Sequence, residues 1–453
     1  MTLSPENTST LPRDLGDGLV LRRSTISDAA ALGDFNARIH SDEGWDKPDE
    51  RLDAWTRDLL ERPHPTFGSG DYTIVEDTHT GKIVSSLNLI SQTWTYGGIP
   101  FGVGRPELVG TLPEYRNRGL VRAQFEEVHR WSAARGELVQ AITGIPYYYR
   151  LFGYEMAVTL GGGRTGYAPH VPSLPEGQAE AFNIRAAGEA DLTFICDLYA
   201  NGCQRYPLAC VWTPELWQYE LNGKSDKNVN RYELYVIESA AGEPAGFLAI
   251  PWFTWGDCMT AKRYELAPGF SWAQVTPAVL RFLRAAYETH PWGMPGERKP
   301  FGYFSLGLGE DHPAYHAMPG HLPRKNKPYA WYIRVADLAG FMRQVTPVLE
   351  QRLTSSVAAG HSGEVRLTFY REGLRLVFDH GKLTTVEAWQ PVPQGHSGEA
   401  AFPELTFLQL LFGYRSLEEL KYAFADCWTD NDATHVLLDA LFPRQPSDIY
   451  PVA

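Results

Sequence analysis

The residue types best suited to chemistry meet in one basic turn, Arg116-Asn-Arg-Gly119. An arginine can hold phosphate oxygens through two parallel hydrogen bonds, and a glycine lets the backbone approach a ligand closely. This combination would suit a pyrophosphate. A basic turn by itself is more often a solvated surface loop, so the segments on either side must decide between the two interpretations.

Those segments predict a strand before the turn and a helix after it. Residues 107–112 are strand-like, and Pro113 ends the run. Val121, Phe125 and Val128 then fall on one face of an amphipathic helix. The first N–H groups of a helix have no internal partner and lie at the positive end of its dipole. The order strand, basic glycine turn, helix therefore favours an anion site at residues 109–121.

Two other clusters carry weaker signals. Asp42, Glu43 and Trp45 would suit an organic cation by charge and cation–π attraction, although a solvated loop is the commoner meaning of such a cluster. His312 and His316 are four residues apart, but a proline lies between them and no H-E-x-x-H pattern is present. We therefore expect no metal site.

The composition narrows the class of protein. With 43% hydrophobic and 21% charged residues, the chain has the profile of a soluble globular protein. Its net charge of −13 argues against nucleic acid as the main partner, and the absence of a long apolar run predicts no membrane span. Five cysteines without a C-x-x-C pair, and a polar N-terminus without a signal peptide, predict a cytoplasmic protein.

A weak internal repeat organises the first two thirds of the 453 residues. Residues 19–32 and 182–194 each predict a strand that ends in arginine, followed by an acidic helix start. Residues 72–84 and 234–246 each predict a hairpin. We expect two copies of one α/β unit, joined by a linker rich in glycine and proline.

The last third predicts a smaller α+β domain. A helix is expected over residues 338–353, followed by alternating strand patterns at 364–369 and 374–378. Helical segments return around 406–411 and 417–424. This order of elements differs from that of the two copies.

The basic turn also carries a family resemblance. Arg116-Asn-Arg-Gly-Leu-Val121 resembles the R/Q-x-x-G-x-G/A signature of the Gcn5-related N-acetyltransferases (GNAT), with valine in the last position. That departure is common to the enhanced intracellular survival (Eis) branch, which the chain resembles along its whole length. The resemblance implies an α/β (α+β) protein with two tandem GNAT folds of mixed, mostly antiparallel sheets. It also implies a C-terminal domain like sterol carrier protein 2 (SCP2-like), and a homohexamer.

The resemblance further implies an acetyl-CoA site. The pantetheine would pair with the strand at 109–111, and the pyrophosphate would lie on the turn at 117–122. The implied coenzyme-binding residues are Val109, Gly110, Thr111, Arg116, Asn117, Arg118, Gly119, Leu120, Val121, Arg122, Gly144 and Ile145.

Two implied catalytic groups lie outside that turn. Residues 144–154 are similar to the family element I-Y-x-x-F-G-Y and align Tyr149 with its catalytic tyrosine, although Tyr148 competes and tandem tyrosines can simply pack a core. A phenol can protonate a leaving CoA thiolate as a general acid. The family also uses its C-terminal carboxylate as the base, which here belongs to Ala453.

These observations predict an acetyl-CoA-dependent N-acetyltransferase acting on a primary amine, such as an aminoglycoside or another polyamine-like cation. The acceptor would lie near Asp42, Glu43 and Trp45. A non-catalytic acyl-CoA-binding or lipid-binding regulator is the alternative. The expected divisions are a tail at 1–15, an active GNAT domain at 16–165, a linker at 166–181, a degenerate GNAT domain at 182–333 and the SCP2-like domain at 334–453.

Overall fold

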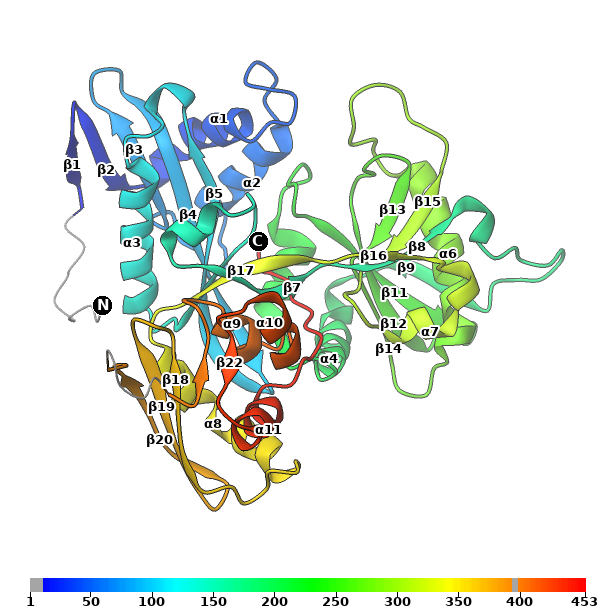
Figure 1. Ribbon diagram of the computed structural model, residues 1–453. Helices are drawn as coiled ribbons and strands as arrows, with labels where there is room; N and C mark the ends of the chain where they lie inside the picture. Colours follow the sequence, from blue (N-terminus) through cyan, green and yellow to red (C-terminus); the bar gives the residue numbers. More distant parts are fainter. Residues whose placement is uncertain (1–10, 393–397) are drawn as a thin grey trace.

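The computed structural model describes residues 11–392 and 398–453, which form three packed units (Figure 1). The fold class is mixed α/β with mostly antiparallel sheets, as predicted. Most of the expected tail at 1–15 lies outside the described residues, although β1 begins at Arg13. No helix of the described ranges is long and apolar enough to cross a membrane.

The first unit is built on one nine-stranded sheet with three α-helices and three short 3-10 helices among its described residues. Its strands run in the order β1-β2-β3-β4-β5-β6-β17-β7, and β10 pairs with β4. The strands are β1 (Arg13–Gly16), β2 (Leu19–Arg23), β3 (Tyr72–Asp77), β4 (Lys82–Tyr96), β5 (Ile99–Thr111), β6 (Val139–Ile142), β7 (Glu155–Leu160), β10 (Leu208–Cys210) and β17 (Tyr329–Val335). The helices are η1 (Ile26–Asp28), α1 (Ala29–Ile39), α2 (Glu50–Glu61), η2 (Pro113–Tyr115), α3 (Leu120–Ala134) and η3 (Tyr148–Phe152).

The second unit repeats this topology on two smaller sheets. One sheet has the order β14-β12-β11-β9 and the other β13-β15-β8-β16. The strands are β8 (Gly163–Tyr167), β9 (Phe182–Ala186), β11 (Tyr232–Ser239), β12 (Pro244–Pro251), β13 (Cys258–Ala261), β14 (Arg263–Leu266), β15 (Tyr303–Leu306) and β16 (Arg324–Asn326). The helices are η4 (Ala168–His170), η5 (Glu189–Asp191), α4 (Leu192–Cys203), α5 (Pro214–Gln218), the π-helix η6 (Tyr219–Gly223), α6 (Trp272–Thr289), α7 (Pro313–Ala317) and η7 (Pro319–His321).

The repeat extends to individual side chains. In the first unit Arg22 bonds the carboxylates of Asp28 and Glu76, both at 2.8 Å. In the second unit Arg185 bonds Asp191 and Glu238, again at 2.8 Å. Both networks link the end of the first strand to the following helix start and to the next strand. The same set of ion pairs therefore occurs in both units.

The two units exchange strands. β17 follows the second unit in the chain but pairs between β6 and β7 of the first. β8 follows the first unit but pairs between β15 and β16 of the second. β8 occupies residues 163–167, so it overlaps the start of the linker expected at 166–181, and sheet membership departs from the expected linear divisions at 165 and 333.

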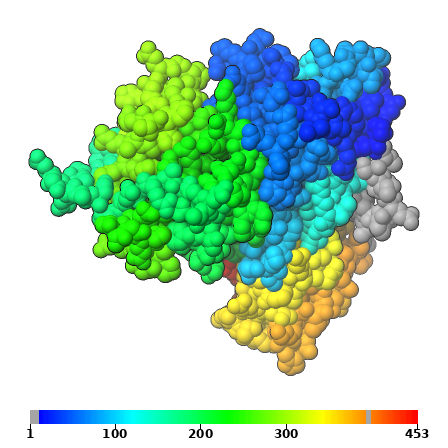
Figure 2. All heavy atoms as spheres, turned by 180° about the vertical axis from the view of Figure 1, so that it is seen from behind, coloured from blue at the N-terminus to red at the C-terminus, as the bar shows by residue number. Residues whose placement is uncertain are grey.

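The third unit packs beneath the first in the view of Figure 1. Its sheet has the order β20-β19-β18-β21-β22, and its helices α8 and α9 contact β5 and β7 of the first unit. Figure 2 shows the other side of the molecule, where the first two units meet side by side. The elements are α8 (Leu338–Thr354), β18 (Gly363–Thr368), β19 (Gly373–Asp379), β20 (Lys382–Trp389), β21 (Ala400–Ala401), α9 (Phe407–Leu411), α10 (Leu417–Ala423), β22 (Trp428–Thr429) and α11 (Asp432–Leu441).

The hydrophobic core joins the units. One cluster of buried side chains runs from the first unit through α4 and the third unit to the last residues of the chain. A separate cluster lies around α6 in the second unit. The C-terminal segment is part of the larger core, with Val452 and Ala453 only 1% and 6% exposed.

Candidate active site

The sheet of the first unit opens between β5 and β6. These strands pair in parallel only where Val103 and Gly104 meet Val139 and Gln140. The rest of β5 continues to Thr111 without a strand partner on that side in the described chain. An unpaired strand edge offers N–H and C=O groups to an extended ligand.

A bulge on the other side of β5 supports this opening. The pairing with β4 shifts between Glu107 and Gly110, and Leu108 has a φ of 52°. A bulge bends its strand and increases the local twist. Residues 109–111 follow this bulge and have no strand partner on the β6 side in the described chain.

The turn after β5 presents free backbone donors. Asn117 and Gly119 have φ values of 61° and 78°, and α3 begins directly after Gly119. The first amides of α3 lack intrahelical partners and lie at the positive end of the helix dipole. Arg116 points its Nε back to the Thr111 carbonyl at 3.3 Å, which keeps the turn compact. The loop can therefore accept a pyrophosphate.

These elements enclose a groove of about 530 Å³. Its volume is in the range of small-molecule sites. Most of the predicted coenzyme residues line it, together with two residues from the end of α1 and several aromatic residues of η3. The lining residues are Ile39, His40, Val109, Gly110, Thr111, Tyr115, Arg116, Asn117, Gly119, Leu120, Val121, Arg122, Ile145, Tyr148, Tyr149, Leu151 and Phe152.

Two predicted coenzyme residues do not line the groove. Arg118 forms an ion pair with Asp17 at 2.7 Å and lies beside the Tyr115 ring. Gly144 lies against the Tyr149 side chain. Its φ is 131°, and a Cβ there would come within 3.3 Å of the Tyr149 Oη. Any larger residue would thus be strained and would crowd the phenol.

Tyr149 is buried at one end of the groove. Its side chain is 5% exposed and packs edge-on against Phe125, Tyr148 and Tyr332. Its Oη makes no hydrogen bond with any described residue, so the phenol is available to a ligand. Burial raises its pKa, and the nearby Glu107 carboxylate raises that pKa further. A phenol that stays protonated at neutral pH is suited to donate a proton.

Tyr148 is placed differently. It is half-buried and contacts the Phe152 ring, and burial raises its pKa while the Arg122 charge lowers it. Both tyrosines line the groove, but only Tyr149 is almost fully enclosed.

The C-terminal residues contact β5, the strand that borders the groove. Arg105 of β5 donates from Nη1 to the Val452 carbonyl at 2.7 Å, and Gln92 of β4 donates to the same oxygen at 3.1 Å. Arg105 also pairs with Glu107 at 2.6 Å. The C-terminus consequently lies in the interior where the first two units meet (Figure 1).

His64 borders the last residue. Its Nδ1 accepts a hydrogen bond from the Thr66 N–H, so a neutral ring carries its proton on Nε2. Burial, together with the Lys224 charge, lowers its pKa to about 4, although the Ala453 backbone opposes this shift. The ring is therefore neutral at pH 7 beside Ala453.

The acidic cluster expected to bind the acceptor lies in an exposed loop after α1. Glu43 pairs with Lys47 at 3.0 Å, and the Arg38 guanidinium lies 5.7 Å from the Trp45 ring centroid. Asp42 is exposed. None of the three lines the groove, although His40, two residues before Asp42, does.

Sequence reasoning missed several residues around the site. No motif in the sequence points to four of them, because each lies in a strand or loop without a recognisable pattern: His40, Gln92, Arg105 and His64. Only Tyr115, in the lead-in to the basic turn, carried a visible signal; its hydroxyl bonds Asp77 at 2.7 Å and holds η2 in place. Among the described residues, no group of three or more His, Cys, Asp or Glu could hold a metal ion.

Residues 38–157 match the family model of the acetyltransferase (GNAT) domain. The first unit is therefore similar to a GNAT acetyltransferase domain over these residues. The groove, η3 and α3 all lie within the matched residues. GNAT domains use an acyl-CoA cosubstrate, and the turn before α3 has the backbone donors that its pyrophosphate would need.

Solved structures share the fold over nearly the whole chain. A probable N-acyltransferase from Enterococcus faecalis V583 has 14% identity and a TM-score of 0.65, with 96% of this chain and 100% of that chain covered. A GCN5-related N-acetyltransferase from Kribbella flavida has 17% identity and a TM-score of 0.62, with 95% and 97% covered. Eis1 from Mycobacterium abscessus has 15% identity and a TM-score of 0.54, with 93% and 96% covered. No curated protein sequence matches the chain.

Proposed function

We propose that the protein transfers an acetyl group from acetyl-CoA to a primary amine. The amine nitrogen attacks the thioester carbonyl carbon, a C–N bond forms and the C–S bond breaks. The thiolate of CoA leaves and takes up a proton, while the attacking nitrogen loses one. The products are an N-acetylated amine and CoA.

The groove between β5 and β6 carries this proposal. It joins a free strand edge at 109–111, an anion-binding helix start at Gly119 and a buried phenol at Tyr149. A pantetheine arm paired with the strand edge would place the pyrophosphate on the turn. Its thioester would then point along β5 towards Tyr149.

Tyr149 is the proposed general acid. Its raised pKa keeps the proton on the phenol at neutral pH, and its Oη has no other partner among the described residues. A CoA thiolate that forms in the same buried site is desolvated as well, which strengthens it as a base. The proton passes from Oη to sulfur, and solvent restores it later.

The carboxylate of Ala453 is the proposed base. Arg105 and Gln92 hold the preceding carbonyl, so the terminal carboxylate is not free to move away. An ordered carboxylate beside β5 can take a proton from the amine nitrogen directly or through one water. The acceptor itself is expected on the side of His40 and the acidic loop that carries Asp42 and Glu43.

Release of CoA, measured with a thiol reagent, tests the activity. The purified protein is assayed with acetyl-CoA and a panel of amines that includes aminoglycosides and linear polyamines. We expect amine-dependent CoA release with at least one member. Coenzyme binding by calorimetry without turnover on any amine would contradict the proposal and favour a non-catalytic acyl-CoA-binding protein.

A C-terminal extension tests the base. Adding a few residues after Ala453 converts its carboxylate to an amide, while the coenzyme groove stays intact. We expect kcat to fall at least tenfold, with coenzyme binding retained. Full activity of the extended chain would remove Ala453 from the mechanism.

A further inference from the structure

The C-terminal segment is held along its length by residues of the first two units. The Asp448 N–H approaches the Leu208 carbonyl, and Ser447 accepts a hydrogen bond from the Thr159 N–H at 3.2 Å. The Tyr450 ring stacks on Trp212 at 4.6 Å between centroids, and the indole N–H donates to the Tyr450 carbonyl at 2.8 Å. Chain termini are usually loose, so this degree of anchoring calls for a reason.

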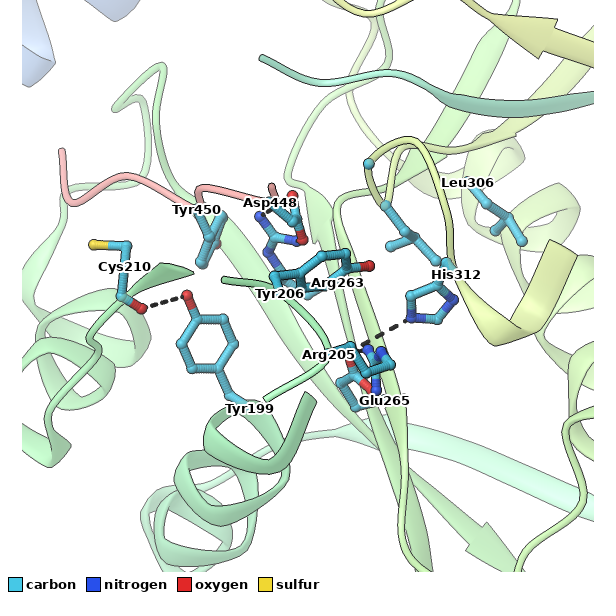
Figure 3. Close-up of polar contacts among 12 residues, drawn as sticks. Tyr199, Arg205, Tyr206, Cys210, Arg263, Glu265, Leu306, His312, Asp448 and Tyr450 are labelled. Carbon is cyan, nitrogen blue, oxygen red and sulfur yellow. Dashed lines mark hydrogen bonds and ion pairs between the residues drawn. The ribbon is translucent and has the colours of Figure 1, made fainter. Parts of the chain in front are cut away.

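Two arginines from equivalent strands make the charged contacts. Arg105 of β5 donates to Val452, as described above. Arg263 of β14 forms a two-pronged ion pair with the Asp448 carboxylate, and its guanidinium carbon lies 4.4 Å from the centroid of the Tyr450 ring. Figure 3 shows Arg263 beside Asp448 and Tyr450 of the tail.

The two arginines belong to a repeated tetrapeptide. The first unit has Arg105-Pro-Glu-Leu108, and the second has Arg263-Tyr-Glu-Leu266. Their strands occupy equivalent places in the two units. In the first unit β5 pairs with β4 on one side and, in parallel, with β6 on the other. In the second unit these pairings are divided between two strands: β14 pairs with β12, and the preceding β13 pairs in parallel with β15. The second copy has thus kept R-x-E-L although it lacks the R-x-x-G turn.

The glutamates of the repeat determine what each arginine can bind. Glu107 pairs with Arg105, which neutralises it and leaves its second nitrogen for a main-chain carbonyl. Glu265 instead pairs with Arg205 and faces His312 at 3.6 Å. Arg263 is therefore left for Asp448, and Figure 3 shows the two systems side by side.

The ion pair between Arg263 and Asp448 is buried, so its loss would be costly. Arg263 is only 7% exposed, and a buried guanidinium without a carboxylate would be strongly unfavourable. Asp448 supplies that carboxylate from the tail. The tail cannot leave without exposing or unpairing Arg263, so the ion pair fixes the position of residues 448–453.

We propose that Arg105 and Arg263 form a clamp that positions the C-terminal carboxylate, and that the second unit has kept its R-x-E-L segment for this purpose. Both are positioning residues, because they act on Ala453 through the tail. The anchoring itself rests only on the geometry; its effect on turnover rests on the proposed function.

Carboxypeptidase digestion of the folded full-length protein tests the anchoring without any substrate. The variant Arg263→Gln with Asp448→Asn replaces the ion pair by a neutral pair and leaves no unpaired buried charge. The control, Arg185→Gln with Asp191→Asn, makes the same exchange in the same unit far from the tail. We expect Ala453 to be released at least tenfold faster in the first variant and within twofold of the wild type in the control. Equal release from both variants would overturn the clamp.

Arg105→Gln tests the other half of the clamp and is expected to accelerate release of Ala453 as well. If it does not, Arg105 is no part of the clamp. Circular dichroism and thermal unfolding of all variants show whether they remain folded at the digestion temperature.

Steady-state kinetics then separate the clamp from the proposed chemistry. For the Arg263–Asp448 variant we expect kcat to fall at least tenfold and KM for acetyl-CoA to stay within twofold, because the groove is untouched. The single variant Arg263→Lys, which keeps a charge for Asp448, should recover part of kcat. Faster release of Ala453 with unchanged kcat would uphold the anchoring but contradict the positioning role and the proposed base. Failure of every amine in the wild-type assay would remove the proposed function, while the digestion result would still decide the anchoring.

Discussion

The two copies of the α/β unit differ most where a strand leads into a helix. In the first copy β5 continues beyond Leu108, and the basic turn precedes α3 at Leu120. In the second copy β14 ends at Leu266, and α6 begins at Trp272. β14 is also an edge strand of its sheet, but the connection after it is shorter and contains no arginine. The two copies therefore share a topology and differ in the basic turn that precedes the helix.

A pair of tyrosines shows the same contrast. Tyr149 and Tyr315 each lie in a short helix that follows the strand paired in parallel, β6 or β15. The Tyr315 hydroxyl bonds the Leu308 N–H at 3.0 Å and the carbonyls of Leu306 and Gly309 at 3.0 and 3.1 Å. The Tyr149 hydroxyl has no such partners among the described residues. A phenol used for structure in one copy is available for chemistry in the other.

The largest expected difference comes from removing each hydroxyl. Tyr149→Phe should lower kcat about a hundredfold, within the usual range for a general acid, and leave acetyl-CoA binding within twofold. Tyr315→Phe should leave kcat within twofold. It should lower the melting temperature, because three buried backbone groups would lose their hydrogen bond to the hydroxyl. Steady-state kinetics and thermal unfolding of both variants check this. Equal effects of the two substitutions on kcat would contradict the assignment of Tyr149.

The contact between the first copy and the tail is expected to depend on pH through His64. Its folded pKa of about 4 lies below the usual 6.5, so the folded state binds fewer protons between these values. Stability should hold above pH 6.5, decline as pH falls to about 4, and level off below that. The loss is on the order of 3 kcal/mol. His64→Gln should show a correspondingly smaller decline in urea unfolding over this range, and a parallel decline would exclude His64 as the source.

A matched pair of glycines tests the helix starts. Gly119 and Gly269 have φ values of 78° and 95° shortly before α3 and α6, and both have open space where a Cβ would stand. Replacement of either by alanine should cost about 1 kcal/mol of stability through backbone strain. Only Gly119→Ala should raise KM for acetyl-CoA, by roughly fivefold. A similar rise for Gly269→Ala would place coenzyme binding in the second copy too.

The smallest effects should be equal in the two copies. Arg22→Met and Arg185→Met each remove a partly exposed arginine that bonds two carboxylates. Each should lower the free energy of unfolding by roughly 0.5–1 kcal/mol, with kcat unchanged. Denaturant unfolding of both variants and of the double variant measures this. Unequal losses of unfolding free energy would show that the repeated network does not stabilise the two copies equally.

Local patterns predicted the local structure well. The strand, basic turn and helix around residues 107–128, the two hairpins and the three helices predicted for the third unit all lie where the sequence indicated, whereas α11 was not predicted. These features depend on periodicity and on turn residues close together in the chain. The mixed α/β class followed from the same patterns and is confirmed.

Long-range pairing was beyond those patterns. β8 contains two glycines in five residues and reads as part of a linker, while β17 reads as a strand whose partners no local signal identifies. Arg105 and Arg263 lie in ordinary strands, and their meaning depends on a tail more than 180 residues away. The roles of Tyr149 and Ala453 stay predictions that the experiments above address, and the role of the acidic cluster also stays a prediction.

The exchanged strands make the two copies inseparable. A fragment that stops near residue 165 would lack β17, so β6 and β7 would have a gap between them and two open edges prone to aggregation. A fragment that starts after it would lack β8 and lose the centre of the β15–β16 sheet. The duplicated region should therefore melt in one cooperative transition, and neither half can be lost, shuffled or expressed alone without the other.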